Sequence, residues 1–496
     1  MNFEIRHIHH RVHHCFPKYV LSISLIYNIL MNDVRYAAID ASTLEKMDFD
    51  KRQVNRKIIR IASPIALQGI VSATLTMVDN LMVGMLGETE LAAVGVAGQI
   101  FMIHYLILFG FVSGAATFLA QFYGAKDMSN IRKVVGFAIT AMAGLGLLFF
   151  TLTNLFTNGL LSIYTGDPAV RELASTYVRI NSFSFLLLAF SAPMEMAFKS
   201  TQQVRIPLIV STVVFSSNTL INYILIFGKL GLPALGVAGA AVGTISARTL
   251  EFLLNSYFAF RDSNEFKGKI SSYFGWNSEL IKRIVRNATP TTINEFFWSV
   301  GQTMYVAAFN RIGTTAYAAF QAANAIFNIF NFASFSVGDA ALILVGEKLG
   351  EGDISYSKKL AAHLIKVSIT VGLTLGLLTV MFAKPLSGIF RLSADGKTYM
   401  FYILLVFGIT MVVDIYTGMQ VTGILRAGGD TRFVMFTECG TVWLVAVPLA
   451  FLAALVWHLP IHLALLATRA ESVVKAVILT KRYLSGKWAN TVIRNL

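Results

Sequence analysis

One carboxylate interrupts the first long apolar stretch of this sequence. Asp79 is surrounded along the chain by Met77, Val78, Leu81 and Met82, none of which is a cation. If the stretch spans a bilayer, a charge near its centre costs about 2.5–3.5 kcal/mol on insertion scales, so the residue needs a function or a partner. A carboxylate in such surroundings is suited to taking up a proton or binding a cation. We therefore predict an ion-coupling role for Asp79; the alternative is a structural carboxylate hydrogen-bonded to a neighbouring helix.

Neutral oxygen donors lie in two later apolar stretches. Asn218 and Asn222 are four residues apart, so a helix places both side chains on one face. Thr244 follows in the next stretch. Amide and hydroxyl oxygens are hard donors that suit sodium, and the sequence predicts a Na⁺ site that combines Asp79 with Asn218 and Asn222. Hydrogen bonds between helices, or simple packing for Thr244, are the alternatives.

The second half of the chain has its own pair of acids in apolar surroundings. Glu295 lies nine residues beyond Arg286, roughly 13 Å along a helix. Asp414 lies twelve residues before Arg426, roughly 18 Å from the same side. These depths would let the two carboxylates meet, and they predict a second ion-coupling site, for Na⁺ or H⁺, at Glu295 and Asp414. A buried structural ion pair is the alternative.

Candidate substrate contacts lie beside these acids. Recognition of an organic cation favours aromatic faces and a carboxylate. Trp298, Gln302 and Tyr305 follow Glu295 around one helix, Met77 flanks Asp79, and Asp339 lies in a further apolar stretch. We predict that these five residues contact substrate, although aromatic residues at helical spacing also face lipid or the protein core.

Composition defines the kind of protein that these residues serve. Of the 496 residues, 55% are hydrophobic and only 14% are charged, whereas soluble domains carry about 25% charged residues. A soluble enzyme, a disordered chain and, with only two cysteines, a disulfide scaffold are excluded. The net charge of +14 is typical of basic cytoplasmic loops in a membrane protein and does not require a nucleic-acid partner.

Apolar stretches of about 20 residues predict an all-α integral membrane protein with twelve spans. The spans lie near residues 58–84, 92–121, 134–157, 173–198, 207–228, 235–260, 287–309, 317–346, 360–383, 398–424, 433–456 and 461–480. Most Lys and Arg residues fall in the loops on one side, and the positive-inside rule makes that side cytoplasmic. The sequence thus predicts a multi-pass protein of the plasma or inner membrane with both termini in the cytoplasm.

The two halves of the chain repeat each other. At a constant offset, Pro64 falls on Pro290, Gly87 on Gly313 and Gly124 on Gly350. Six spans per half give both halves the same orientation, and we predict two six-helix bundles related by a pseudo-twofold axis along the membrane normal. The predicted parts are an N-terminal extension (1–54) outside the core, an N-terminal lobe (55–260), a cytoplasmic linker (261–286), a C-terminal lobe (287–485) and a cytoplasmic tail (486–496).

Four motifs carry a family resemblance over roughly residues 55–485. They are PIALQGIVSATLTMVDNLMVGMLGETELAAVGVAGQI (64–100), LINYILIFGKLGLPALGVAGAAVGTISARTLEF (220–252), INEFFWSVGQTMYVAAFNRIGTTAYAA (293–319) and GILRAGGDTRF (423–433). In this order they resemble the multidrug and toxic compound extrusion (MATE) transporters. The resemblance implies a secondary antiporter that exports organic, often cationic, compounds in exchange for Na⁺ or H⁺.

The resemblance also assigns residues. It matches Asp79 to the family's acidic residue in the first helix, and Glu295 and Asp414 to acids on helices seven and ten that bind the coupling cation in one branch. Asn222 departs from the proton-coupled archaeal-type branch, which has an aspartate there. Because an asparagine does not titrate, a proton relay confined to this lobe is disfavoured.

Rival functions lack their motifs. The sequence contains no GxxxxGK[ST], HExxH or GxSxG pattern, so an ATP-driven pump and a membrane-integral enzyme both lose support. A flippase for lipid-linked oligosaccharides, built from similar bundles, remains an alternative. We expect a monomer in the lipid bilayer with a small organic substrate, an inorganic coupling ion, no other cofactor and no nucleic-acid partner.

Overall fold

The computed structural model describes residues 49–494, and all the regular structure in this part of the chain is helical. The predicted extension up to residue 48 lies outside it. The first bundle contains α3 (Lys51–Gly84), α4 (Glu88–Gly124), α5 (Met128–Leu155), α6 (Thr157–Ser162), α7 (Pro168–Asn181), α8 (Ser184–Ser200), α9 (Arg205–Phe227) and α10 (Gly236–Phe260). A connecting segment with the short helix η1 (Ile270–Tyr273) follows.

The second bundle contains α11 (Ser278–Asn310), α12 (Thr314–Gly350), α13 (Ile354–Ile389) and α14 (Ala394–Gly418), which continues through η2 (Met419–Ile424) and α15 (Leu425–Ala427). The chain then forms α16 (Thr431–Thr441), η3 (Val442–Ala446), α17 (Val447–Phe451) and η4 (Leu452–Val456) as one span. It ends with α18 (Ile461–Thr468) and α19 (Ala470–Leu484).

The helix lengths agree with the expected membrane architecture. Nine helices or helix series among the described residues are long and apolar enough to cross a bilayer, and the pair α7 and α8, bent by 50°, makes a tenth. The remaining two predicted spans are α11 and the pair α18 and α19. The hydropathy of α11 is reduced because it carries Asn287, Asn294 and Glu295 among its apolar residues.

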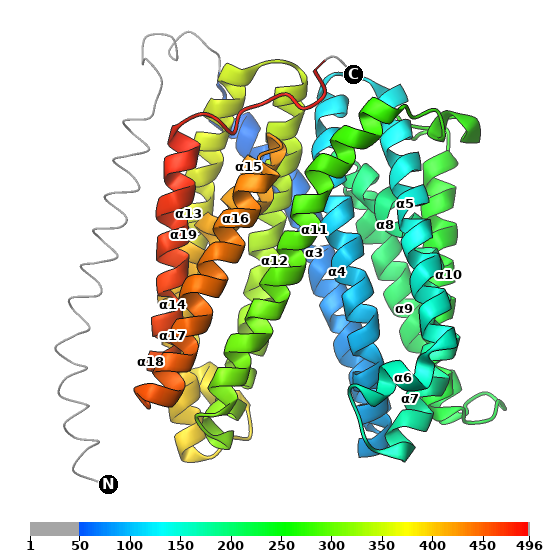
Figure 1. The fold of residues 1–496 in the computed structure, drawn as a ribbon, viewed down its shortest axis with the longest axis vertical. Helices are drawn as coiled ribbons and strands as arrows, with labels where there is room; N and C mark the ends of the chain where they lie inside the picture. Colours follow the sequence, from blue (N-terminus) through cyan, green and yellow to red (C-terminus); the bar gives the residue numbers. More distant parts are fainter. Residues whose placement is uncertain (1–48, 495–496) are drawn as a thin grey trace.

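The two bundles meet at one end and diverge toward the other (Figure 1). They meet at the end that carries the connecting segment and the described C-terminal residues. The first half of each bundle's leading helix packs on the opposite bundle. Ile58 and Ile61 of α3 join the core of the second bundle, and α11 packs closely on α4, where Gly114 faces Ala288.

The contacts between the bundles follow the sequence repeat. A Cβ atom on Gly124 would lie 1.8 Å from the carbonyl oxygen of Glu347, and one on Gly350 would lie 1.8 Å from that of Gln121. Gly124 and Gly350 are equivalent positions of the repeat, and so are Gln121 and Glu347. This reciprocal contact is what a twofold relation between the halves requires. It also requires glycine at both positions, because any side chain would push the helices apart.

Candidate functional site

The predicted cluster in the first bundle is assembled by two helices. Helix α3 brings Asp79 beside α9, whose face carries Asn218 and Asn222 one turn apart. The amide nitrogen of Asn222 donates to Asp79 Oδ1 at 2.8 Å and lies 3.0 Å from Asn218 Oδ1. Asn218 and Asn222 are buried, whereas Asp79 is half-buried. One amide group therefore links all three residues.

The other atom of this amide has no hydrogen-bond partner in the described chain. Asn222 Oδ1 is buried and unpaired. It faces α10, where a Cβ atom on Gly243 would lie only 1.8 Å away, so glycine is needed to admit the asparagine. The adjacent Thr244 donates to the carbonyl of Ala240 at 3.0 Å and hydrogen-bonds to Tyr177 of α7. Thr244 is thus next to the cluster without a direct bond to Asp79.

Asp79 is a carboxylate without a salt bridge among residues 49–494. Arg248 of α10 interacts electrostatically with Asp79, but it already has an acidic partner, because it lies 2.6 Å from Glu251. A carboxylate that receives only a neutral amide donor retains its negative charge, which can be balanced by a proton or a small cation. The oxygens of Asp79 and the two asparagines form a donor set that suits sodium.

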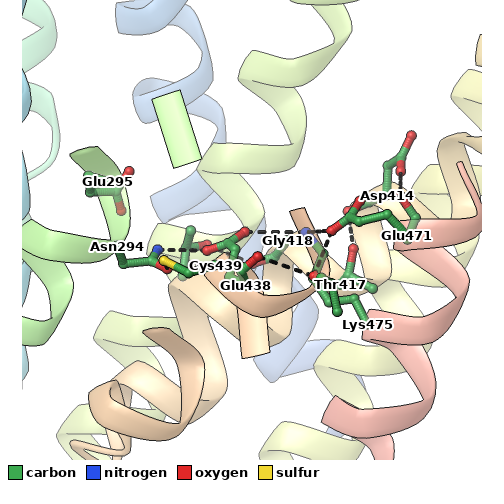
Figure 2. Close-up of polar contacts among 12 residues, drawn as sticks. Asn294, Glu295, Asp414, Thr417, Gly418, Glu438, Cys439, Glu471 and Lys475 are labelled. Atoms are coloured by element: carbon green, nitrogen blue, oxygen red, sulfur yellow. Dashed lines mark hydrogen bonds and ion pairs between the residues drawn. The ribbon is translucent and has the colours of Figure 1, made fainter. Parts of the chain in front are cut away.

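A larger polar network crosses the second bundle (Figure 2). Asn294 of α11 donates to Glu438 of α16 at 2.7 Å. Lys475 of α19 lies 3.4 Å from Glu438 and 2.8 Å from Glu471. Thr441 also donates to Glu471, at 2.9 Å. The ammonium group of Lys475 therefore lies between two buried carboxylates from different helices.

Asp414 belongs to the same region of the bundle. It accepts a hydrogen bond of 2.8 Å from Ser472 and pairs with Arg469 at 3.2 Å. The guanidinium of Arg469 also lies over two aromatic rings, 5.5 Å from the centroid of Phe327 and 5.2 Å from that of Phe407. Arg469 is therefore positioned by an ion pair with Asp414 and by cation–π contacts with two aromatic rings.

The charges of this network do not balance. It contains three carboxylates and two bases, Arg469 and Lys475; the carboxylates are Asp414, Glu438 and Glu471. With all five groups ionised, the network carries one net negative charge. A buried surplus charge is costly, and uptake of one proton or one monovalent cation would remove it.

Glu295 has a different partner from Asp414, although their depths suggested a meeting. Glu295 pairs with Arg426 at 3.1 Å. Arg426 is 2% exposed and donates to Ser113 of α4 at 2.5 Å, while its backbone carbonyl accepts from Thr117 of α4 at 2.8 Å. The pair thus lies between the bundles, where Arg426 connects the second bundle to the first.

A second group of polar residues lies at this junction. Asp339 of α12 interacts electrostatically with Lys199 of α8 and with Arg426. Lys199 is paired with Glu195, which accepts a hydrogen bond of 2.9 Å from Gln68 of α3. The Glu195–Lys199 spacing suggested an ordinary helical ion pair; the structure adds an acid from the opposite bundle and an amide from another helix.

The remaining predicted substrate residues have varied surroundings. Trp298 and Gln302 are half-buried on α11. Tyr305 packs on the core of the second bundle with its ring 5.7 Å from that of Phe309, and Met77 is 64% exposed. Their role as substrate contacts stays a prediction.

Four site residues escaped the sequence reasoning: Glu438, Arg469, Glu471 and Lys475. Glu471 and Lys475 are four residues apart, a spacing that indicates a helical ion pair. Their position in the last predicted span was the available signal. Nothing along the chain connects them with Glu438 or Asp414, because those contacts join separate helices.

Duplicated six-helix bundles with unbalanced carboxylates at membrane depth define a membrane transporter rather than an enzyme. The MatE family model matches residues 64–224 and 290–452. The chain therefore belongs to the MatE family, the family that the four motifs resembled, and like its members it is an ion-coupled transporter of small molecules in the plasma membrane.

Named relatives cover most of the chain. The probable multidrug resistance protein NorM of Thermotoga maritima is 24% identical over 89% of this chain and 94% of its own length. The multidrug resistance protein MdtK of Edwardsiella ictaluri is 24% identical over 81% of this chain and 88% of its own length.

Solved structures share the fold. A MATE protein in complex with MaL6 has a TM-score of 0.80 at 18% identity, covering 88% of this chain and 97% of that one. A MATE family transporter in an outward-facing conformation has a TM-score of 0.79 at 18% identity, with the same coverage.

Proposed function

We propose that the protein exports organic, often cationic, compounds in exchange for Na⁺ or H⁺ by alternating access. The observation that carries the proposal is an uncompensated negative charge in each bundle: Asp79 in the first, and the network of Asp414, Glu438, Glu471, Arg469 and Lys475 in the second. Relatives named as multidrug resistance proteins support the substrate class.

The orientation follows from charge. The bundles meet at the end that carries the connecting segment 261–277, and the basic residues of that segment and of the neighbouring loops favour the cytoplasmic side. On this assignment both termini are cytoplasmic, and the bundles are closed toward the cytoplasm, which corresponds to an outward-facing state. We expect the chain to act as a monomer, because both bundles and their charged residues belong to one chain.

In the first bundle the side-chain amide of Asn222 changes its orientation when an ion binds. Its nitrogen bonds to Asp79 and Asn218, and its oxygen is unpaired. Rotation of the amide by half a turn would present the oxygen to a cation held by Asp79, or to the proton of a neutral Asp79. Because the donor set contains one carboxylate and two amides, it favours sodium over a proton relay.

In the second bundle the pair of Glu295 and Arg426 transmits the change. Glu295 interacts electrostatically with Glu438 of the network, so uptake of a cation or proton there changes the hold of Glu295 on Arg426, which also contacts Ser113 of the opposite bundle. Loosening this connection favours opening toward the cytoplasm. The ion drives transport only if the two states bind it with different affinity, and the contact of Arg426 with Ser113 joins the bundles only when they are closed at that end.

Ethidium efflux from sealed proteoliposomes tests the proposal. Sodium and pH gradients are imposed separately, with all protein facing one way. We expect one of the two gradients to drive ethidium against its concentration gradient. Equal ethidium movement with both gradients collapsed, or uptake of a lipid-linked oligosaccharide in place of ethidium, would contradict it.

A further inference from the structure

A groove with a volume of about 610 Å³ lies between α11 and α16, away from the charge network. It begins near the connecting segment, where both helices have their N-terminal ends. Its lining combines the cations Lys282, Arg286 and Arg432 with large apolar side chains, among them Ile293, Met435 and Phe436.

Three cations of the groove form no ion pair within residues 49–494. Lys282, Arg286 and Arg432 are exposed, and none forms a salt bridge or side-chain hydrogen bond within residues 49–494. The acids nearest to them in sequence are paired with other arginines. Glu279 pairs with Arg283 at 2.8 Å, and both carboxylate oxygens of Asp430 bond to Arg482, at 2.6 and 2.9 Å. Glu279 also interacts electrostatically with Lys282, but three exposed cations with no ion pair give the groove a concentrated positive charge.

The polarity of the groove changes along the helices. The distance along α11 from Lys282 to Ile293 is roughly 16 Å, at 1.5 Å per residue. On α16, Met435 and Phe436 follow Arg432 in the same direction, and Phe436 is 72% exposed. Cations at the membrane surface followed by exposed apolar side chains at greater depth match the headgroup and the acyl chain of a phospholipid.

We infer that this groove binds an anionic phospholipid of the cytoplasmic leaflet. Lys282, Arg286 and Arg432 contact its phosphate, and Ile293 and Phe436 contact an acyl chain. The two helices that form the groove also carry Asn294 and Glu438, which are hydrogen-bonded on their inner side at 2.7 Å. A lipid held by both helices would therefore stabilise their packing next to the charge network.

Thermal unfolding of the full chain in neutral detergent tests this inference. The protein is titrated with phosphatidylglycerol, with phosphatidylcholine of the same acyl chains, or with inorganic phosphate. Phosphatidylglycerol should raise the melting temperature in a saturable way, and the other two should not. Juxtamembrane cations each attract anionic lipid by about 1 kcal/mol, so the triple variant K282Q/R286Q/R432Q should bind phosphatidylglycerol about 100-fold more weakly.

A matched triple variant keeps the same net charge change. Lys126, Lys269 and Lys487 are exposed in loops near the same end of the protein, and K126Q/K269Q/K487Q should bind phosphatidylglycerol like the unaltered chain. The single variant F436A, which keeps all three cations, should weaken binding of long-chain but not of short-chain phosphatidylglycerol. Equal loss in both triple variants, or equal stabilisation by inorganic phosphate, would overturn the inference. Because transport is not measured, these results are independent of the proposed exchange of ions and drugs.

Discussion

The guanidinium of Arg426 lies 3.1 Å from the carboxylate of Glu295, and the same side chain donates to Ser113 of the opposite bundle. An acid that interacts electrostatically with the proposed ion-coupling network is thus connected through one buried residue to the surface where the bundles meet. Because Arg426 is buried, its positive charge is stabilised by these partners, and a change in the charge around Glu295 alters the contact between the bundles.

Loss of Arg426 should destabilise the protein strongly. Arg426→Ala leaves Glu295 without its partner, and breaking one side of a buried ion pair costs about 3–5 kcal/mol. The double variant Glu295→Gln/Arg426→Ala should recover part of this stability, because no unpaired charge remains. The free energy of unfolding in detergent measures both effects. Arg391→Ala, at an exposed arginine, is the control; equal stability of the single and double variants would show that the pair is not a unit.

Asp79→Asn should abolish ion-driven export while the protein still inserts and folds. The neutral side chain keeps an oxygen that can accept from Asn222, so the helix contact at 2.8 Å survives while the charge is lost. Coupling free energies of 1–3 kcal/mol correspond to a fall of about 5–150-fold in gradient-driven ethidium accumulation. The exposed Asp395→Asn should transport normally. Full accumulation by Asp79→Asn would remove this carboxylate from the mechanism.

Gly243→Ala should reproduce much of this defect without changing any charge. The added Cβ atom would lie 1.8 Å from Asn222 Oδ1 and must displace the amide that bonds to Asp79. Overpacking of this kind costs about 1–3 kcal/mol of stability. Ethidium efflux should fall, whereas Gly144→Ala, where no atom lies within 4 Å of the new methyl group, should leave it unchanged.

Glu438→Gln should remove the excess charge of the second bundle. The amide oxygen can still accept from Asn294, but the network then has two acids and two bases. We expect cation uptake by this bundle to disappear and stability to be unchanged or slightly higher, since a surplus buried charge is gone. Sodium binding measured by calorimetry on an Asp79→Asn background isolates this site. Sodium binding by Glu438→Gln equal to that of the parent chain would contradict the assignment of one surplus negative charge to this network. Glu88→Gln, at an exposed glutamate, is the control.

Gly124→Ala should open the cytoplasmic end. Its methyl group would lie 1.8 Å from the Glu347 carbonyl oxygen, so the closed state loses about 1–3 kcal/mol while an open state is unaffected. Spin labels at Lys126→Cys and Lys487→Cys, with the native cysteines replaced, should report longer distances. Gly350→Ala should also lengthen these distances, because Gly350 is the position equivalent to Gly124 in the repeat. Gly440→Ala is the control, because its methyl group would meet no atom within 4 Å, and it should leave the distances unchanged. Unchanged distances in both would contradict the closure seen here.

Hydropathy and residue spacing were enough to predict the helical membrane class, the duplicated halves and the cluster of Asp79 with Asn218 and Asn222. Hydropathy and the repeat are properties along the chain. The two asparagines lie one turn apart on a single helix, so their proximity follows from the sequence. Only the contact of this helix with Asp79 of α3 had to come from the structure. The resemblance to transporters, carried by contiguous motifs, agrees with the family match.

The pairing of the buried charges could not be predicted from the sequence. Glu295 pairs with Arg426 rather than lying with Asp414, and Lys475 lies between Glu438 and Glu471. Depth along a helix follows from residue number, but the direction in which a side chain faces depends on the rotation and packing of several helices at once. The net charge of a buried site is a sum over these neighbours, and no single stretch of sequence contains them all.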